Sequence, residues 1–149
     1  MKVYIGADHR GFSLKEKIKT LLQEKNISFE DLGNTVLDPA DDYPEFAQKV
    51  AQKVSREQDS LGIVACGSGV GVDVAANKVD RIRSALITSP QQITAARQDD
   101  NVNVMALAAD FFKEEDLEST LTAFLNTAYD SSEKHQRRLD EIENIEHEV

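Results

Sequence analysis

The sequence predicts an α/β protein in which helices cover both faces of a parallel sheet. Short β-rich runs alternate with segments whose apolar residues recur at helical spacing, from one end of the chain to the other. The run LGIVAC at 61–66 is almost wholly apolar, which is typical of a strand buried on both faces. Because parallel neighbours need crossover connections, this alternation predicts a parallel sheet, and 149 residues suffice for one domain spanning 1–149.

We expect five strands, at residues 2–7, 27–33, 61–66, 82–87 and 102–108. The intervening helices are expected at 13–25, at 43–57, from within the turn at 67–71 to residue 78, at 89–98 and at 114–128, and a C-terminal helix at about 131–146. Ser89, Pro90 and Gln92 form the N-cap and capping-box pattern of the helix at 89–98. In the C-terminal helix the apolar face consists of Leu139, Ile142 and Ile145.

The chain is acidic, with a formal net charge of −10 from 27 acidic and 17 basic residues. This balance argues against nucleic acid and anionic membranes as partners, because both are bound through a basic surface. No apolar run is long enough to span a bilayer, and the start MKVYIGADH is too short and polar for an export signal. The single cysteine can form no internal disulfide, which fits a reducing compartment, and the missing export signal is the better reason to expect a cytoplasmic protein.

The turn GSGVG at 67–71 leads from the third expected strand into a helix, at the edge of the sheet where ligands bind in such folds. Successive backbone amides in a glycine turn form a nest for an anion. A nucleotide P-loop would need Gly-Lys-Ser/Thr after its glycines, and the dinucleotide spacing G-x-G-x-x-G does not match either. Asp8 and His9, after the first strand, would also intrude on a pyrophosphate. No nucleotide cofactor is therefore expected.

Cys66 ends the third strand, directly before this turn. A lone free cysteine usually packs as a small apolar side chain. Facing a helix N-terminus and a ring of amides, however, its thiolate is stabilised and could act as a nucleophile or a general base. Asp8 and His9 also allow two interpretations. Asp8 could be a helix cap and His9 a structural residue, or the two could act together at the ligand-binding edge of the sheet.

The segment KHQRR at 134–138 is the densest cationic cluster of this acidic chain. Lys134, Arg137 and Arg138 lie three and four residues apart, so in a helix they can converge on one anion. The alternative is a solvated helix face. A zinc site is disfavoured, because Cys66 and the three histidines include no closely spaced pair of ligands, and no metal is expected.

Together these features resemble a known family along nearly the whole chain. The segments GADHRGFSLKE, DYPEFA, ACGSGVGVDVAANK, IRSAL, ARQDDNVNVMAL and KHQRRLDEI occur in the order and spacing of the ribose-5-phosphate isomerase B and LacA/LacB sugar-phosphate isomerases. The resemblance implies a Rossmann-like three-layer α/β/α sandwich with a five-stranded parallel sheet. It also implies a homodimer, or a tetramer of two dimers, with active sites shared between subunits and the C-terminal helix at the dimer interface. The implied reaction passes through a cis-enediolate and uses no cofactor or metal.

By this resemblance Cys66 is the base that moves a proton between C1 and C2 of the sugar phosphate. The amides of Gly67, Gly69, Val70 and Gly71 form the anion hole for the enediolate oxygen, which Ser68 assists. Some relatives carry a Glu just past the last glycine, where this chain has Val72, which leaves Cys66 as the base. The substrate-binding residues that follow are Asp8, His9, Arg10, Tyr43, Asp100, Lys134, Arg137 and Arg138.

The chain departs from the family pattern near the ring-opening and phosphate positions. Asp99 stands in place of a His that helps to open the furanose ring, and it would need to be protonated, which the neighbouring charge of Asp100 favours. Asp110 and Lys134 stand where arginines are common, and lysine lacks the bidentate fork of arginine. Arg10, where many relatives have Ala, restores positive charge. The phosphate end of the pocket is therefore expected to be rebuilt.

The sequence is thus interpreted as a sugar-phosphate isomerase, with ribose 5-phosphate to ribulose 5-phosphate as the expected conversion. One alternative is an isomerase of another pentose or hexose phosphate, of the allose- or galactose-6-phosphate type. Another is a non-catalytic partner subunit or a sugar-phosphate binding module, which the missing ring-opening His would favour.

Overall fold

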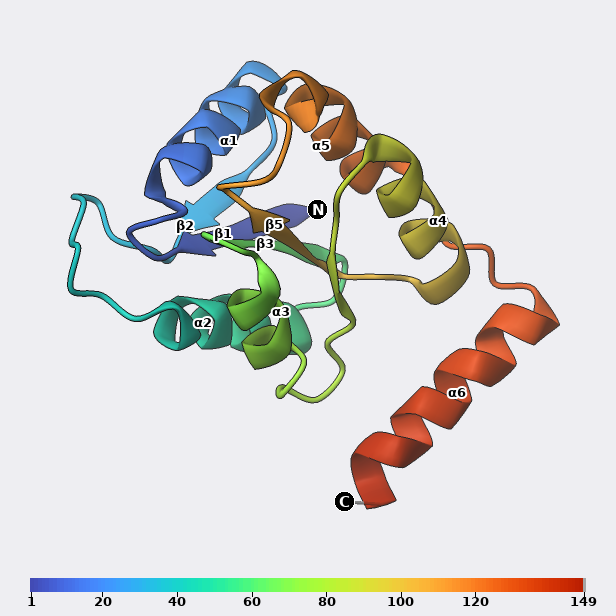
Figure 1. The fold of residues 1–149 in the computed structure, drawn as a ribbon. Helices are drawn as coiled ribbons and strands as arrows, with labels where there is room; N and C mark the ends of the chain where they lie inside the picture. Colours follow the sequence, from blue (N-terminus) through green and yellow to red (C-terminus); the bar gives the residue numbers. More distant parts are fainter. Residues whose placement is uncertain (149) are drawn as a thin grey trace.

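A five-stranded, all-parallel sheet forms the centre of the computed structural model, which describes residues 1–148 (Figure 1). Its strands are β1 (Lys2–Ala7), β2 (Phe29–Asp31), β3 (Ser60–Cys66), β4 (Ser84–Leu86) and β5 (Val104–Ala108). Their spatial order is β2-β1-β3-β5-β4, and every neighbouring pair is parallel. The predicted fold class is confirmed. The strands β2 and β4 are shorter than expected because each lies at an edge and pairs with a single neighbour.

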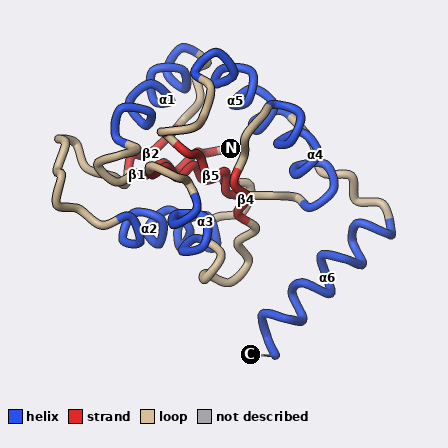
Figure 2. Tube along the Cα trace, viewed as in Figure 1, coloured by secondary structure: helices blue, strands red, loops and turns tan. Residues whose placement is uncertain are grey.

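Helices cover both faces of the sheet (Figure 2). One face carries α1 (Phe12–Glu24), α4 (Pro90–Asp100) and α5 (Leu117–Asn126), the last preceded by a 3₁₀ turn at Glu114–Asp116. The other face carries α2 (Tyr43–Arg56) and α3 (Val70–Ala76). No helix in residues 1–148 is long and apolar enough to cross a membrane.

Two hydrophobic cores follow from the alternation of side chains along each strand. In β3, Ile63 and Ala65 pack with α1, α4 and α5, whereas Val64 and Cys66 pack with α2 and α3. The helices α2 and α3 present small and β-branched residues to this second core, such as Ala47 and Val72, each fully buried. This alternation fixes the direction of the Cys66 thiol, which faces the α2 and α3 side of the sheet.

The start of α4 follows only half of the expected capping box. The Ser89 hydroxyl accepts the amide of Gln92 at 3.2 Å, as predicted. The side chain of Gln92, however, accepts the amide and the hydroxyl of Thr88, at 2.7 and 3.0 Å, instead of the Ser89 amide. Two donors on Thr88 outweigh the single donor on Ser89.

The C-terminal helix α6 (Glu133–Glu148) lies beside the sandwich (Figure 1), and near its end the Glu146 carboxylate accepts the Arg81 amide at 3.1 Å. His135 is its only buried residue in the described chain, and contacts near the start of α6 join it to α4. On the apolar face expected from the sequence, Ile142 is 41% and Ile145 is 60% exposed. The chain therefore leaves much of this face uncovered by its own residues.

Candidate active site at the carboxyl edge of the sheet

Three central strands bring the motif residues after β1, β3 and β5 to one edge of the sheet. Ala7 pairs with Ala65, and Cys66 pairs with Ala108, so the three strands end side by side. The backbone continues this contact beyond the strands, since the Asp110 amide donates to the Gly67 carbonyl at 3.0 Å. Cys66 therefore lies between the loop that carries Asp8 and the loop that carries Asp110.

Cys66 is the last residue of β3 and is 4% exposed. Its burial agrees with the ordinary packing role of a free cysteine, but its position places the thiol directly before the glycine turn. The amides of Ser68 and Gly69 donate to no acceptor within residues 1–148. The first turn of α3 adds amides that have no partner inside the helix. The thiol is thus followed by a set of amides able to hold an oxyanion.

Gly69 gives this turn its shape. It is the N-cap of α3 and has a φ of 73°, in the left-handed region that favours glycine. A Cβ at this position would lie 2.9 Å from both the Leu107 carbonyl carbon and the Ala108 nitrogen. Backbone atoms of β5 cannot move aside as a flexible side chain can, so the turn is seated tightly on β5.

Replacing Gly69 by alanine is expected to lower the free energy of unfolding by about 2 kcal/mol, because the backbone is strained and the methyl group meets backbone. Thermal or urea unfolding measures this loss, and the same substitution should also displace the amides of the turn. Gly71→Ala is the matched control, since the three atoms nearest to its Cβ all belong to the Tyr43 ring, the closest at 2.6 Å, and this 39% exposed side chain can change rotamer. Equal stability losses in the two variants would contradict this account of the turn.

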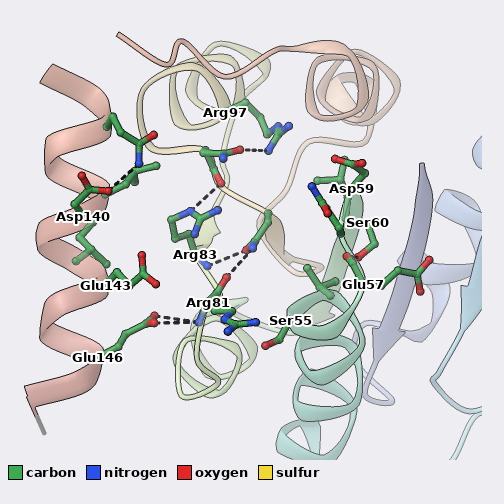
Figure 3. A pocket seen from close by; sticks show the side chains of 18 of the residues that line it. Ser55, Glu57, Asp59, Ser60, Arg81, Arg83, Arg97, Asp140, Glu143 and Glu146 are labelled. Carbon is green, nitrogen blue, oxygen red and sulfur yellow. Dashed lines mark hydrogen bonds between the residues drawn. The ribbon is translucent and has the colours of Figure 1, made fainter. Parts of the chain in front are cut away.

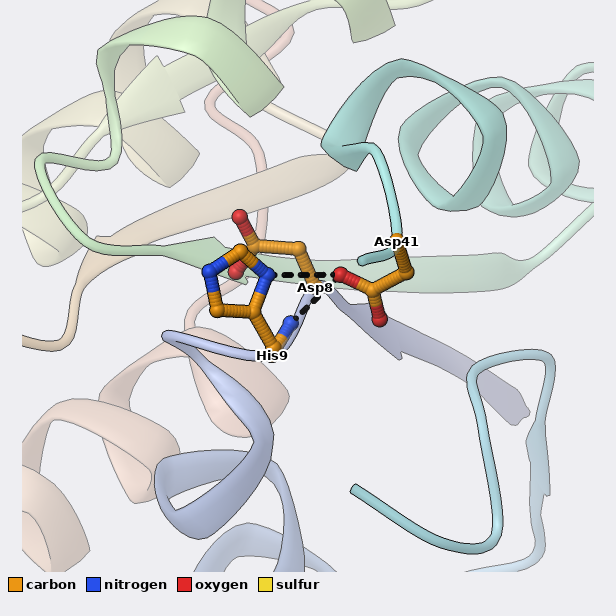
Figure 4. A group of neighbouring side chains, drawn as sticks. All are labelled: Asp8, His9 and Asp41. Carbon is orange, nitrogen blue, oxygen red and sulfur yellow. Dashed lines mark hydrogen bonds and ion pairs between the residues drawn. The ribbon is translucent and has the colours of Figure 1, made fainter. Parts of the chain in front are cut away.

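Asp8 and His9 lie in the loop between β1 and α1. Asp8 is 5% exposed, and its Oδ1 accepts the amides of Arg10 and Gly11, each at 3.0 Å, so it shapes the loop. The His9 ring is bonded through Nδ1 to Asp41 Oδ1 at 2.8 Å (Figure 4). This bond raises the pKa of His9 above its ordinary value; burial and Arg10 oppose the change, and the charges of Asp8 and Asp41 add to it.

Asp8, His9 and Asp41 are also the group within residues 1–148 whose donor atoms are close enough for a metal ion, all within 4.8 Å of one another. The 2.8 Å bond between His9 and Asp41 already joins two of these three residues. We therefore interpret the group as a histidine hydrogen-bonded to a carboxylate.

Arg10 and Asp110 form an ion pair above Gly67. A Cβ on Gly67 would lie 2.5 Å from Arg10 Nε and 2.9 Å from Asp110 Oδ2, so the pair lies directly over the first residue of the turn. Their side chains are 59% and 37% exposed. The positive charge expected from Arg10 is present beside the site, but Asp110 already compensates it. Tyr43, at the start of α2, packs its ring against Gly71.

The remaining predicted site residues lie at the opposite edge of the sheet within this chain. Asp99 and Asp100 end α4, just before the loop whose Asn103 carbonyl accepts the amide of Gly62 near the start of β3. From this loop, β5 extends about 13 Å to Ala108, which pairs with Cys66. Lys134, Arg137 and Arg138 lie in α6, beside the end of α4. Within one chain, Cys66 and Asp99 therefore lie at opposite edges of the sheet.

His135 joins α6 to α4 and was not among the predicted site residues. It is 5% exposed, with Nδ1 3.0 Å from the Asp130 carbonyl and Nε2 3.7 Å from Asp99 Oδ1. A second tie, from the Asp130 amide to the Gln98 carbonyl at 2.9 Å, fixes the same junction. Asp41 was missed as well. No spacing pattern marks either residue, because their partners come from distant parts of the chain.

A cleft of about 660 Å³ separates α6 from the sandwich (Figure 3). Arg81, Arg83 and Arg97 line one side, and acidic residues of α6 such as Glu143 and Glu146 line the other. Burial lowers the pKa of Arg83, against the opposing charge of Glu146. The cleft lies at the amino edge of the strands, so it is distinct from the region around Cys66.

Comparisons with known proteins agree on one family. Residues 3–142 match the Ribose/Galactose Isomerase family. The ribose-5-phosphate isomerase B of Mycobacterium tuberculosis is 36% identical over 140 residues, which cover 94% of this chain and 86% of that protein. The crystal structure of ribose-5-phosphate isomerase B from Mycoplasma genitalium with bound ribulose 5-phosphate has a TM-score of 0.93 and 40% identity, covering 99% and 97% of the two chains. The type B enzyme of Trypanosoma cruzi has a TM-score of 0.94 and 30% identity, with 100% of both chains covered.

Proposed function

Because the chain belongs to the Ribose/Galactose Isomerase family, and is therefore a sugar-phosphate isomerase, we propose that it interconverts ribose 5-phosphate and ribulose 5-phosphate. The observation that carries this proposal is the position of Cys66 at the end of β3, directly before a turn whose Ser68 and Gly69 amides have no acceptor in the described chain. The similar proteins are ribose-5-phosphate isomerases B, and the one from Mycoplasma genitalium has ribulose 5-phosphate bound, which supports the choice of substrate.

In the proposed reaction the Cys66 thiolate removes the proton from C2 of the open aldose. The electron pair of that C–H bond forms the C1–C2 double bond, and the carbonyl oxygen becomes an enediolate oxygen. The amides of the 67–71 turn stabilise this charge, which exists only during the reaction, and the Ser68 hydroxyl assists. The O2 proton moves to O1, the C2 carbonyl forms, and the thiol returns its proton to C1. The hydrogen lost at one carbon is regained at the next, so the chemistry needs no external oxidant.

The direct test is to incubate the purified full chain with ribose 5-phosphate and to follow ribulose 5-phosphate by NMR. Turnover is expected, together with incorporation of one solvent deuterium at C1 when exchange at the thiol is faster than reprotonation. Allose 6-phosphate and galactose 6-phosphate serve as comparison substrates. The absence of turnover on ribose 5-phosphate, with the fold intact, would refute the proposed substrate.

The proposal includes a homodimer whose two active sites are shared. Asp99 lies near the opposite end of β5 from Cys66 within one chain, about 13 Å away along the strand, and Lys134, Arg137 and Arg138 lie in α6, which contacts α4. A second copy related by two-fold symmetry can bring its own Asp99 edge to the Cys66 edge of the first. The exposed Ile142 and Ile145 on α6 offer apolar surface for this contact. Within this scheme Asp99 exchanges the ring-opening proton and the α6 cations bind the phosphate, and the dimers could pair further into tetramers.

Mixing two inactive variants tests the shared site. Cys66→Ala and Asp99→Ala chains, unfolded and refolded together, should recover about a quarter of wild-type activity, because half of the dimers are mixed and each carries one intact site. The matched control is a mixture of Cys66→Ala with Asp8→Asn, both at the same edge of one chain, which should recover none. If each active site were formed by one chain, the first mixture would also recover no activity, and that result would reject the shared site.

We expect Asp110→Asn to lower the KM for ribose 5-phosphate about threefold, because it frees the Arg10 guanidinium for the phosphate. The effect should shrink at high salt, as for other exposed charges. The free energy of unfolding should hardly change, since both side chains of the pair are partly exposed. Steady-state kinetics at two ionic strengths measure the effect, and Arg10→Gln should move KM in the opposite direction. A rise in KM for Asp110→Asn would show that Asp110 itself helps to bind substrate.

The proposed location is the cytoplasm, where a catalytic thiol stays reduced. The single cysteine of the chain is buried and free, which agrees with such a reducing compartment.

A further inference from the structure

Asp41 holds His9 by two bonds at once. Its Oδ1 accepts the backbone amide of His9 and lies against the ring Nδ1, both at 2.8 Å. Asp41 lies in the segment between β2 and α2, 32 residues from His9 in sequence, and its side chain is only 6% exposed. One carboxylate thus fixes both the backbone and the ring of the same residue.

The bond to Asp41 determines which ring nitrogen of His9 is free. A carboxylate can only accept, so Nδ1 must carry the hydrogen that Asp41 receives. The other nitrogen, Nε2, points away from Asp41 (Figure 4) and has no partner within residues 1–148. When the ring is protonated, Nε2 is a charged donor suited to an anionic oxygen such as that of a phosphate.

The carboxylate is itself anchored from its other side. Asn34 donates to Asp41 Oδ2 at 2.9 Å, and the Asn34 carbonyl accepts from the fully buried Lys15 at 2.6 Å. The chain of contacts therefore runs from α1, through the segment after β2, to the His9 ring. These contacts involve only part of the segment, since Val36 and Leu37 between Asn34 and Asp41 are 74% and 54% exposed.

The charged groups that face His9 come from two segments. Asp41 lies before α2, while Asp8 and Arg10 flank His9 in the loop after β1. The hydrogen bond to Asp41 is the largest influence and raises the pKa of His9; burial opposes it, the charges of Asp8 and Asp41 reinforce it, and Arg10 counteracts it. A raised pKa keeps the ring charged to higher pH, and the charge is lost as the pH rises through the pKa of the folded protein.

We propose that Asp41 is a positioning residue that locks the His9 ring with Nδ1 towards itself, so that Nε2 donates to the phosphate of the substrate. This inference rests on the proposed function for the identity of the substrate. The locking of the ring by Asp41 is a property of the free protein. The two parts can therefore be measured separately.

The first experiment titrates the three histidines by NMR in the full-length protein and in Asp41→Asn. The midpoint of His9 should fall, because the hydrogen bond that raises its pKa is weakened, and its tautomer signal should change. Asp38→Asn is the matched control, because Asp38 lies in the same segment and its carboxylate bonds only the Ala40 amide within residues 1–148. Asn34→Ala, which removes the second support of Asp41, should shift His9 in the same direction by less. An unchanged His9 midpoint and tautomer in Asp41→Asn would overturn the proposal.

The second experiment measures KM and kcat for ribose 5-phosphate across pH. In Asp41→Asn the KM at pH 7 should rise about tenfold with little change in kcat, and the pH at which KM begins to rise should move down with the His9 midpoint. In a His9→Ala background the same substitution should have no further effect on KM. A purely structural role for Asp41 would not move the pH profile of KM, and an unmoved profile would overturn the phosphate part of the proposal. If the wild-type protein does not turn over the sugar, the proposed function fails, whereas the histidine titration still decides the role of Asp41.

Discussion

Cys66→Ser is expected to lower kcat for sugar-phosphate isomerisation by roughly three orders of magnitude, the usual contribution of a general base. Serine has nearly the volume of cysteine, but its hydroxyl stays protonated at neutral pH and cannot take a proton from carbon. KM should change little, because the binding groups around the turn remain. Steady-state kinetics and the exchange of the C2 hydrogen with solvent both measure the effect, and the exchange should stop.

Ser60→Ala is the matched control for this experiment. Ser60 lies at the other end of the same strand and is also buried, and its hydroxyl bonds the Glu57 carbonyl at 2.7 Å. This variant should keep wild-type kcat while losing some stability. If Cys66→Ser retained activity within tenfold of wild type, another group would be the base and the proposed mechanism would be wrong.

Lys15→Met is expected to lower the free energy of unfolding by about 3 kcal/mol, the typical cost of removing one partner of a buried ion pair. Lys15 has no exposed surface, and its ammonium bonds Asp31 at 2.8 Å and the Asn34 carbonyl at 2.6 Å. Methionine fills the space but leaves both acceptors without this donor. Urea unfolding of the two proteins measures the difference.

Lys19→Met is the control for Lys15. Lys19 also bonds Asp31 at 2.8 Å, but its side chain is 22% exposed, so the expected loss is only about 1 kcal/mol. A loss of similar size in both variants would show that burial of Lys15 is not decisive. Removing the charge of Asp31 as well, in Lys15→Met with Asp31→Leu, should recover part of the stability.

The stability difference between wild type and Lys15→Met depends on pH through the pKa of Asp31. Burial alone would raise the pKa of Asp31, but hydrogen bonds from Lys15, Lys19 and the Gly33 amide outweigh it, and the pKa lies below its ordinary value. A lowered pKa adds stability that is fully present above the pKa of the unfolded chain and is lost as the pH falls through that of the folded protein. The difference between wild type and Lys15→Met should therefore narrow below about pH 4.

The sequence alone predicts the layers of the fold and the centre of the site. Hydrophobic period distinguishes strand from helix, and the almost wholly apolar run at 61–66 indicates the buried central strand, which the structure confirms as β3. The place of Cys66 before a glycine turn is a local property, because residues adjacent in sequence stay adjacent in space. Asp8 and His9 could be assigned to the edge where Cys66 lies, because the carboxyl ends of parallel strands meet at one edge of a sheet.

Contacts between distant segments could not be predicted in this way. Arg10 and Asp110 are 100 residues apart, and only the adjacent ends of β1, β3 and β5 bring them together above Gly67. Asp41 reaches His9 because the segment after β2 folds back over the loop after β1. No periodic pattern in the sequence marks either pair, since each contact depends on where the crossover connections place distant segments.

The sequence by itself determined the α/β architecture and the Cys66 turn, since both depend on local pattern. Only the tertiary structure decided which of the other candidate residues share an edge with Cys66. Because α4 runs back along the sheet, Asp99 at its end lies at the opposite edge, although the start of the same helix lies near the active edge. The direction of one helix thus separates two halves of the predicted site within a single chain.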